Sequence, residues 1–172
     1  VCYLSFEVPD KNKHIARLVS LMLGKANTTA YTDGQLTPYL DFLDTHMIHL
    51  DMHEVPPTPE NILNRADRVR RTHPLKYLVV DPYLFIETQS GNGETETQSI
   101  KAMLTKFQTW GRVNHIWVVI VAHPRGLKTV NGRNELEAIN MYTISGSANW
   151  ANLADSSSPS RVYRSPTAPL RA

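Results

Sequence analysis

Four polar positions in the sequence directly follow a run of mostly apolar residues, as the end of a buried strand does. They are Glu7, Asp81, His123 and the turn Ser145-Gly146-Ser147. In open α/β sheets, ligands bind beyond the carboxyl ends of the strands. The four positions are therefore candidates for one shared site. Taken singly, each could instead be a solvated strand end, a helix cap or a hydrogen-bonded structural residue.

Asp81 has the most informative local pattern, because it follows the apolar run Tyr77–Val80. Four apolar residues and an aspartate form the Walker B pattern of nucleotide-binding proteins. A carboxylate held at a strand tip can bind Mg²⁺ through water and so place the phosphates of a nucleotide. Many strands end in aspartate, so the nucleotide-binding interpretation of Asp81 depends on the other segments.

The elements that must position these residues alternate between strands and helices. Val1–Phe6, Tyr77–Val80 and Met141–Ile144 are short apolar runs that predict strands. The run Ile116–Ala122 is nearly all apolar and rich in β-branched residues, which predicts a central strand buried on both faces. Strands that alternate with helices predict an α/β fold with a largely parallel central sheet flanked by helices.

Four helices are predicted from apolar periodicity and from start and stop signals. Asp10–Leu23 carries apolar residues at helical spacing and is followed by glycine. Thr37-Pro38 and Thr58-Pro59 each join a capping residue to a proline, which favours the first turn of a helix. A fourth helix, around Ile100–Phe107, is predicted to end near Gly111.

The composition is that of an ordinary globular domain. The 172 residues carry a formal net charge of +2, which neither predicts nor excludes nucleic-acid binding. Cys2 is the single cysteine, so an internal disulfide cannot form, and this fits a reducing compartment such as the cytoplasm. We recognise neither a membrane span nor a signal peptide. The start at Val1, inside an apolar run, suggests that an N-terminal portion is missing.

Taken together, six segments resemble the DnaB/Twinkle-like replicative DNA helicases, whose motor has a RecA-like P-loop NTPase fold. In the family's order they are Ser5-Phe6-Glu7-Val8-Pro9, Leu78-Val79-Val80-Asp81-Pro82, Ile120-Val121-Ala122-His123-Pro124-Arg125, Ile144-Ser145-Gly146-Ser147-Ala148-Asn149-Trp150, Asn152-Leu153-Ala154-Asp155 and Val162-Tyr163-Arg164. The resemblance implies the C-terminal part of a helicase core over residues 1–164, with 165–172 as a disordered tail. The family's P-loop is absent from the sequence and is expected upstream of Val1. The fold is therefore expected to be N-terminally incomplete, and this chain alone to hydrolyse little ATP.

The resemblance implies a role in Mg²⁺-dependent ATP hydrolysis for each charged position. Glu7 would orient and deprotonate the attacking water, Asp81 would hold Mg²⁺, and His123 would sense the γ-phosphate. An arginine would reach the nucleotide of the neighbouring subunit and stabilise charge in the transition state. Arg164 matches the family's arginine finger, but the segment before it is longer than in the family, so Arg161 competes for this role.

The same resemblance implies the partners. These are neighbouring subunits in a homohexameric ring, single-stranded DNA, and an upstream primase domain where the family carries one, in a bacterial or phage-infected cell. DNA contacts are implied after Asp81, after His123 and near Gly146. In the basic loop after His123, Arg125, Lys128 and Arg133 are expected to contact DNA phosphates without regard to base sequence. A solvated loop with a few charges is the alternative.

Three other interpretations of the sequence stay open. A RecA-fold ATPase that is not a helicase is one rival, against which His123-Pro124 and Gly146-Ser147 favour the helicase. A non-enzymatic remnant that binds nucleic acid or a partner is another, and the missing P-loop favours it. A third interpretation is a metal site, but without cysteines or a fixed ligand spacing we expect surface histidines. The residues concerned are His46, His49, Asp51, His53 and Glu54.

Overall fold

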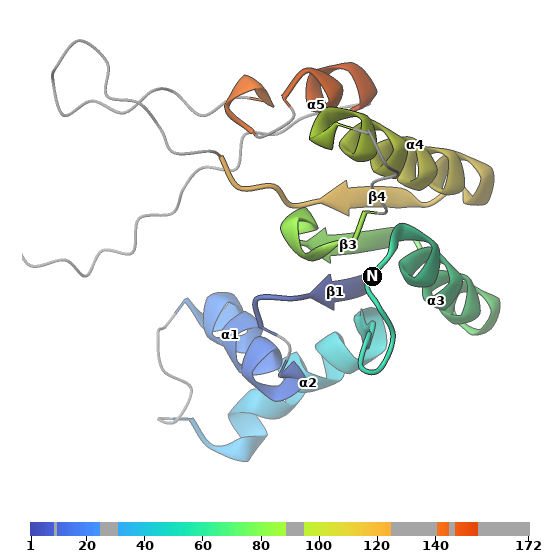
Figure 1. Cartoon of the computed structure of the whole chain (residues 1–172). Helices are drawn as coiled ribbons and strands as arrows, with labels where there is room; N and C mark the ends of the chain where they lie inside the picture. The colour runs from blue at the N-terminus through green and yellow to red at the C-terminus, as the bar shows by residue number, and fades with distance from the viewer. Residues whose placement is uncertain (9, 25–30, 89–94, 125–140, 145–146, 155–172) are drawn as a thin grey trace, which may run out of the picture. The chain divides into compact units, whose positions relative to one another are not determined.

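A parallel sheet of four strands organises the chain (Figure 1). The strands are β1 (Cys2–Ser5), β2 (Ile48–His49), β3 (Tyr77–Asp81) and β4 (Trp117–Ile120), in the spatial order β2-β1-β3-β4. Each neighbouring pair is parallel, which confirms the predicted α/β class. The computed structural model describes residues 1–8, 10–24, 31–88, 95–124, 141–144 and 147–154.

The chain divides into two compact units, Val1–His123 and Pro124–Ala172. The first unit contains the sheet and four longer helices, and Figure 1 shows α1 and α2 grouped together on one side of the strands. Those helices are α1 (Lys11–Leu23), α2 (Asp33–His46), α3 (Pro59–Thr72) and α4 (Glu96–Asn114), with the short 3₁₀ helix η1 (Tyr83–Phe85) after β3. The described part of the second unit holds η2 (Met141–Thr143) and α5 (Ser147–Leu153).

The central strands of the first unit direct alternate side chains into a buried core. Cys2 and Leu4 of β1 alternate with partly exposed neighbours, as do Leu78 and Val80 of β3, and all four side chains are buried. The helices contribute buried apolar residues to the core, among them Ile62, Ala66, Met103 and Phe107. Burying a side chain as large as that of Phe107 contributes about 1.5–3 kcal/mol.

Helices α1 and α3 begin within one residue of their predicted starts, and each has a side-chain cap. The Asp10 side chain accepts hydrogen bonds from the backbone at the start of α1, and Gly24 ends this helix with φ of +66°. The Thr58 side chain accepts from the backbone N–H of Asn61, and Pro59 occupies the first position of α3. Local sequence signals are sufficient here because capping involves only residues within one turn.

The predicted start of the second helix at Thr37-Pro38 is wrong. Helix α2 begins at Asp33, and the Gln35 side chain accepts a hydrogen bond from the backbone N–H of Thr32 at 3.0 Å, as in a capping box. Pro38 lies inside the helix on its exposed surface, where its ring removes one backbone hydrogen bond. The earlier cap therefore outweighs the proline signal.

The predicted end of the fourth helix near Gly111 is also wrong, because α4 continues to Asn114 and is capped by His115. Gly111 serves instead as the point of contact between α4 and β4. A Cβ atom at this position would lie 2.8 Å from the carbonyl oxygen of Ile116 and 3.0 Å from a methyl carbon of Val118. The glycine thus permits the helix to approach the strand that leads to His123.

Replacing Gly111 with alanine is therefore expected to lower the free energy of unfolding by about 1–3 kcal/mol, since overpacking outweighs the better helix propensity of alanine. Chemical denaturation of the variant measures this change. Gly34→Ala is the matched control, because a Cβ atom at Gly34 in α2 meets nothing within 4 Å. An unchanged stability for Gly111→Ala would show that β4 can move away from the helix at no cost.

Strand β4 was predicted to be central and buried on both faces, and this is wrong for the described residues. It pairs with β3 alone and forms one edge of the described sheet. The side chains of Trp117 and Val119 are 61% and 43% exposed. An apolar, β-branched composition predicts that a segment forms a strand. Whether that strand is buried depends on which other elements cover it.

The prediction of a strand at Met141–Ile144 is wrong as well. Met141–Thr143 forms the 3₁₀ helix η2, and Ile144 makes only an isolated antiparallel bridge with Pro124. Asn149 and Trp150 in α5 are buried. Ser145 and Gly146 lie outside the described residues.

Candidate active site at the carboxyl end of the sheet

The parallel strands bring the predicted charged positions to one end of the sheet. Ser5 is in register with Asp81, and the backbone N–H of Phe6 donates to the carbonyl of Asp81 at 2.8 Å. Glu7 therefore follows β1 beside the point where β3 ends. His123 follows β4, which is paired in parallel with β3. This shared edge is the place predicted for a ligand site.

Glu7 and His123 are in direct contact although 116 positions separate them in the sequence. Nε2 of His123 and Oε1 of Glu7 are 2.8 Å apart, and a proton on Nε2 makes the imidazole the donor. The side chain of Glu7 is 48% exposed, and that of His123 is 46% exposed. The carboxylate is therefore held in place by the imidazole but remains accessible to water, as a general base must be.

Asp81 has a different partner, Tyr3 of β1. The Tyr3 hydroxyl donates a hydrogen bond to Oδ2 of Asp81 at 2.5 Å. Among the described residues, no hydrogen bond or ion pair joins Asp81 to Glu7 or His123. The site therefore consists of two separate hydrogen-bonded pairs, one on β1 and β3 and one on the loops that follow β1 and β4.

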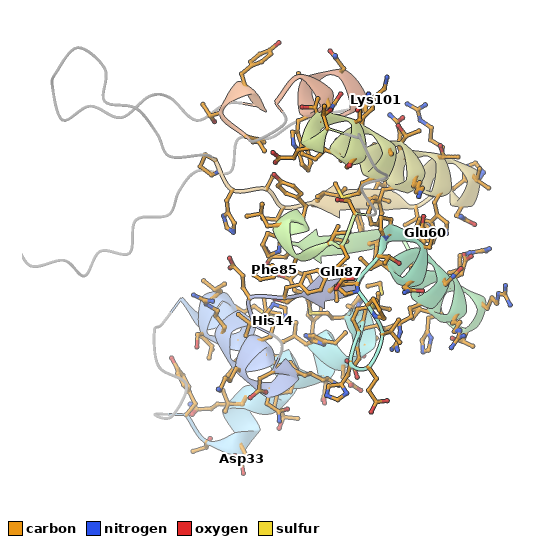
Figure 2. All side chains as sticks on the ribbon, in the orientation of Figure 1. His14, Asp33, Glu60, Phe85, Glu87 and Lys101 are labelled. Carbon is orange, nitrogen blue, oxygen red and sulfur yellow. The ribbon has the colours of Figure 1, made fainter. Side chains whose placement is uncertain are left out.

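Tyr3 belongs to a small aromatic cluster between α1 and the sheet, with His14 and His49. The Tyr3 ring stacks on the ring of His14 with centroids 4.4 Å apart, and Figure 2 labels His14 on α1. Nδ1 of His14 and Nε2 of His49 are 2.8 Å apart. Burial lowers the pKa of His14 and of His49 below the usual range, which favours a neutral pair near pH 7.

Burial is the main cause that raises the pKa of Tyr3, and the hydrogen bond to Asp81 raises it further. The phenol therefore keeps its proton and acts as the donor to the carboxylate. Sequence analysis missed Tyr3 because a tyrosine in an apolar strand is ordinarily a packing residue. The sequence carries no local signal for this contact, because it depends on the register between β1 and β3.

The structure also describes the loop after Asp81, one of the three places where DNA contact was predicted. Leu84 and Phe85 in η1 are 58% and 52% exposed, and the rings of Phe6 and Phe85 lie 5.7 Å apart. The other predicted contact and finger residues lie outside the described residues. They are Arg125, Lys128, Arg133, Arg161 and Arg164.

Within the part of the chain that the structure describes, no three metal-binding side chains lie close enough together to hold a metal ion. This applies to the histidines from the end of α2 to the start of α3. His46 and His53 are exposed, as predicted. His49 differs, because it is partly buried and directed at His14. Asp81 suits Mg²⁺ better, since its carboxylate supplies the oxygen ligand that this ion prefers and Tyr3 occupies only one of the two oxygens.

Comparison with solved structures identifies the fold. The chain is similar to a solved ATPase domain with a TM-score of 0.67 at 14% sequence identity, over 90% of this chain and 56% of that chain. It is also similar to a DnaB-like replicative helicase, solved in a study of its interactions with primase. There the TM-score is 0.66 at 14% identity, over 90% of this chain and 39% of that chain. The chain thus has the RecA-like α/β fold of helicase ATPase domains.

Sequence comparison adds a particular relative, the chloroplastic/mitochondrial Twinkle homolog protein of Arabidopsis thaliana. The two are 34% identical over 99 residues, which is 58% of this chain and 13% of that protein. No protein-family model matches the chain. The predicted resemblance is confirmed: the chain is similar to a Twinkle homolog protein in sequence and to a DnaB-like helicase in fold, and it spans only part of each of these proteins. None of the described helices is long and apolar enough to cross a membrane.

Proposed function

We propose that this chain forms the C-terminal part of the ATPase core of a DnaB/Twinkle-like replicative DNA helicase. The observation that carries the proposal is the contact between Glu7 and His123 beside Asp81, at the carboxyl end of a parallel sheet. A contact between a carboxylate and an imidazole that come from loops after two different strands is more specific than either residue alone. The similarity to Twinkle homolog protein and to DnaB-like structures supports the same function.

The intact protein in this proposal carries a P-loop as well as this chain. The chain covers 56% of the solved ATPase domain that it resembles, so a complete motor of this fold needs further residues. A P-loop supplies backbone N–H groups that wrap the phosphates, and its motif G-x-x-x-x-G-K-(S/T) does not occur in this sequence. The chain by itself is therefore expected to remain nearly inactive as an ATPase.

Each charged side chain has a distinct task in ATP hydrolysis. Glu7 accepts the proton of the attacking water and orients it for in-line attack on the γ-phosphate. His123 holds the Glu7 carboxylate through Nε2, and a γ-phosphate oxygen would compete for the same N–H. This competition would link the presence of γ-phosphate to the freedom of the base, which gives the predicted sensor a physical mechanism.

Asp81 is the metal-binding residue in this proposal. Mg²⁺ would neutralise the negative charge that develops on the phosphates during the transfer. Asp81 would hold a water of the ion's hydration shell with the oxygen that Tyr3 leaves open. Arg164, or Arg161 in its place, would act on the nucleotide of a neighbouring subunit in a homohexameric ring.

The DNA strand is proposed to contact the basic loop after His123. Replacing Lys128 and Arg133 together with alanine in the intact protein is expected to weaken binding to single-stranded DNA similarly for all base sequences. The dependence of binding on salt should flatten by about one unit of slope for each lost phosphate contact. Fluorescence anisotropy over a range of salt concentrations measures both quantities, and basal ATP hydrolysis should persist while its stimulation by DNA falls.

The matched control for this experiment replaces Arg68 and Lys101, two exposed basic residues of α3 and α4, with alanine. This variant loses the same charge but should bind DNA as the wild type does. If Lys128→Ala/Arg133→Ala left affinity and salt slope unchanged while ATP hydrolysis continued, an ATPase that is not a helicase would explain the chain better. If the intact protein neither bound nor hydrolysed ATP, the non-enzymatic alternative would hold.

A further inference from the structure

We infer that Tyr3 is a positioning residue for Asp81, whose hydroxyl holds one carboxylate oxygen and leaves the other for the water shell of Mg²⁺. This inference rests on the proposed function, because it assumes that Asp81 is the metal-binding carboxylate. Tyr3 lies outside the residues that the sequence singled out for chemistry. Its role follows from its contacts in the folded chain.

The sheet register places Tyr3 within reach of Asp81. Tyr3 is in register with Val79 and Ser5 with Asp81, so Tyr3 and Asp81 are diagonal neighbours on one face of the sheet. Aromatic side chains can bridge such a diagonal between adjacent strands. The resulting distance of 2.5 Å between the hydroxyl oxygen and Oδ2 of Asp81 is typical of a charge-assisted hydrogen bond.

The Tyr3 ring is restrained from two directions, so its hydroxyl is a donor in a fixed place. The ring stacks on His14 of α1 at an interplanar angle of 25°, and it packs edge-on with the His49 ring, whose centroid is 6.3 Å from its own. The hydrogen bond between His14 and His49 ties these two rings together. A fixed donor limits the orientations of the Asp81 carboxylate, as partners of metal ligands commonly do.

A purely structural role is the competing explanation. In that case the hydrogen bond to Asp81 only provides the partly buried Tyr3 hydroxyl with a partner. Replacing Tyr3 with phenylalanine separates the two explanations, because the ring and its stacking on His14 remain while the donor is lost. A structural role would affect stability and turnover together. A positioning role would affect the concentration of divalent ion that the site requires.

The test is Tyr3→Phe in the intact protein, with two measurements. Electron paramagnetic resonance measures the affinity for Mn²⁺ in the presence of a non-hydrolysable ATP analogue. Steady-state hydrolysis measures the Mg²⁺ concentration that gives half-maximal turnover. We expect Mn²⁺ to bind roughly tenfold more weakly and the Mg²⁺ requirement to rise by a similar factor, with kcat nearly restored at saturating Mg²⁺.

Tyr77→Phe is the control, because it removes the same hydroxyl group at an exposed position of β3. The inference is overturned if Tyr3→Phe matches Tyr77→Phe in both measurements, or if its kcat falls and excess Mg²⁺ does not restore it. These outcomes leave the proposed function standing as long as the wild type is active. A wild-type protein without ATP turnover and without Mn²⁺ binding in the presence of the analogue would instead reject the proposed function, and this inference with it.

Discussion

Replacing Glu7 with glutamine in the intact protein is expected to reduce ATP hydrolysis by roughly a hundredfold or more, while ATP binding persists. The amide keeps the shape of the side chain and can still accept the hydrogen bond from His123, but it cannot take a proton from water. The loss of a general base typically reduces the rate by 10²–10⁴-fold. Single-turnover hydrolysis measures the rate, and binding of a fluorescent ATP analogue measures the affinity.

Glu54→Gln is the matched control for this prediction. It neutralises a carboxylate that is 85% exposed in the segment between β2 and α3, outside the Glu7–His123 pair. Its turnover should equal that of the wild type. Turnover near the wild-type level in Glu7→Gln would remove Glu7 from the catalytic assignment, and the base would then have to be sought in another residue.

Replacing Asp81 with asparagine is the second large effect, and it should have a different signature. We expect hydrolysis to fall roughly a hundredfold at ordinary Mg²⁺ concentrations, because the site loses the negative charge that we propose to hold the ion. The amide oxygen can still accept the hydrogen bond from Tyr3, so the fold around β3 should be preserved. Hydrolysis as a function of Mg²⁺ and Mn²⁺ concentration measures the change.

Partial recovery of Asp81→Asn at high divalent-ion concentration is the diagnostic result. Glu7→Gln should show no such recovery, because the missing function there is proton transfer rather than metal binding. The two variants therefore serve as controls for each other. An Asp81→Asn protein with an unchanged dependence on Mg²⁺ would show that this carboxylate does not hold the ion.

Several local features were predictable from sequence because each depends on residues close together in the chain. The caps at Asp10 and Thr58 are examples, since each hydrogen bond spans only two or three positions. The buried face of α4 was predictable from apolar spacing, and Ile100 and Phe107 are indeed buried. The start of α2 was missed because two local signals, a capping box and a proline, compete there.

The alternation of strands and helices in the sequence determined the fold class, and the motifs and their order determined the resemblance to DnaB/Twinkle-like helicases. Only the tertiary structure showed that His123 contacts Glu7 and that the uncharged side chain of Tyr3 holds Asp81. It also showed that β4 is an edge strand in the described sheet and that Gly111 supports close packing. These features depend on sheet register and on the approach of a helix to a strand. Both are set by contacts between distant segments, and no local pattern of residue types encodes such contacts.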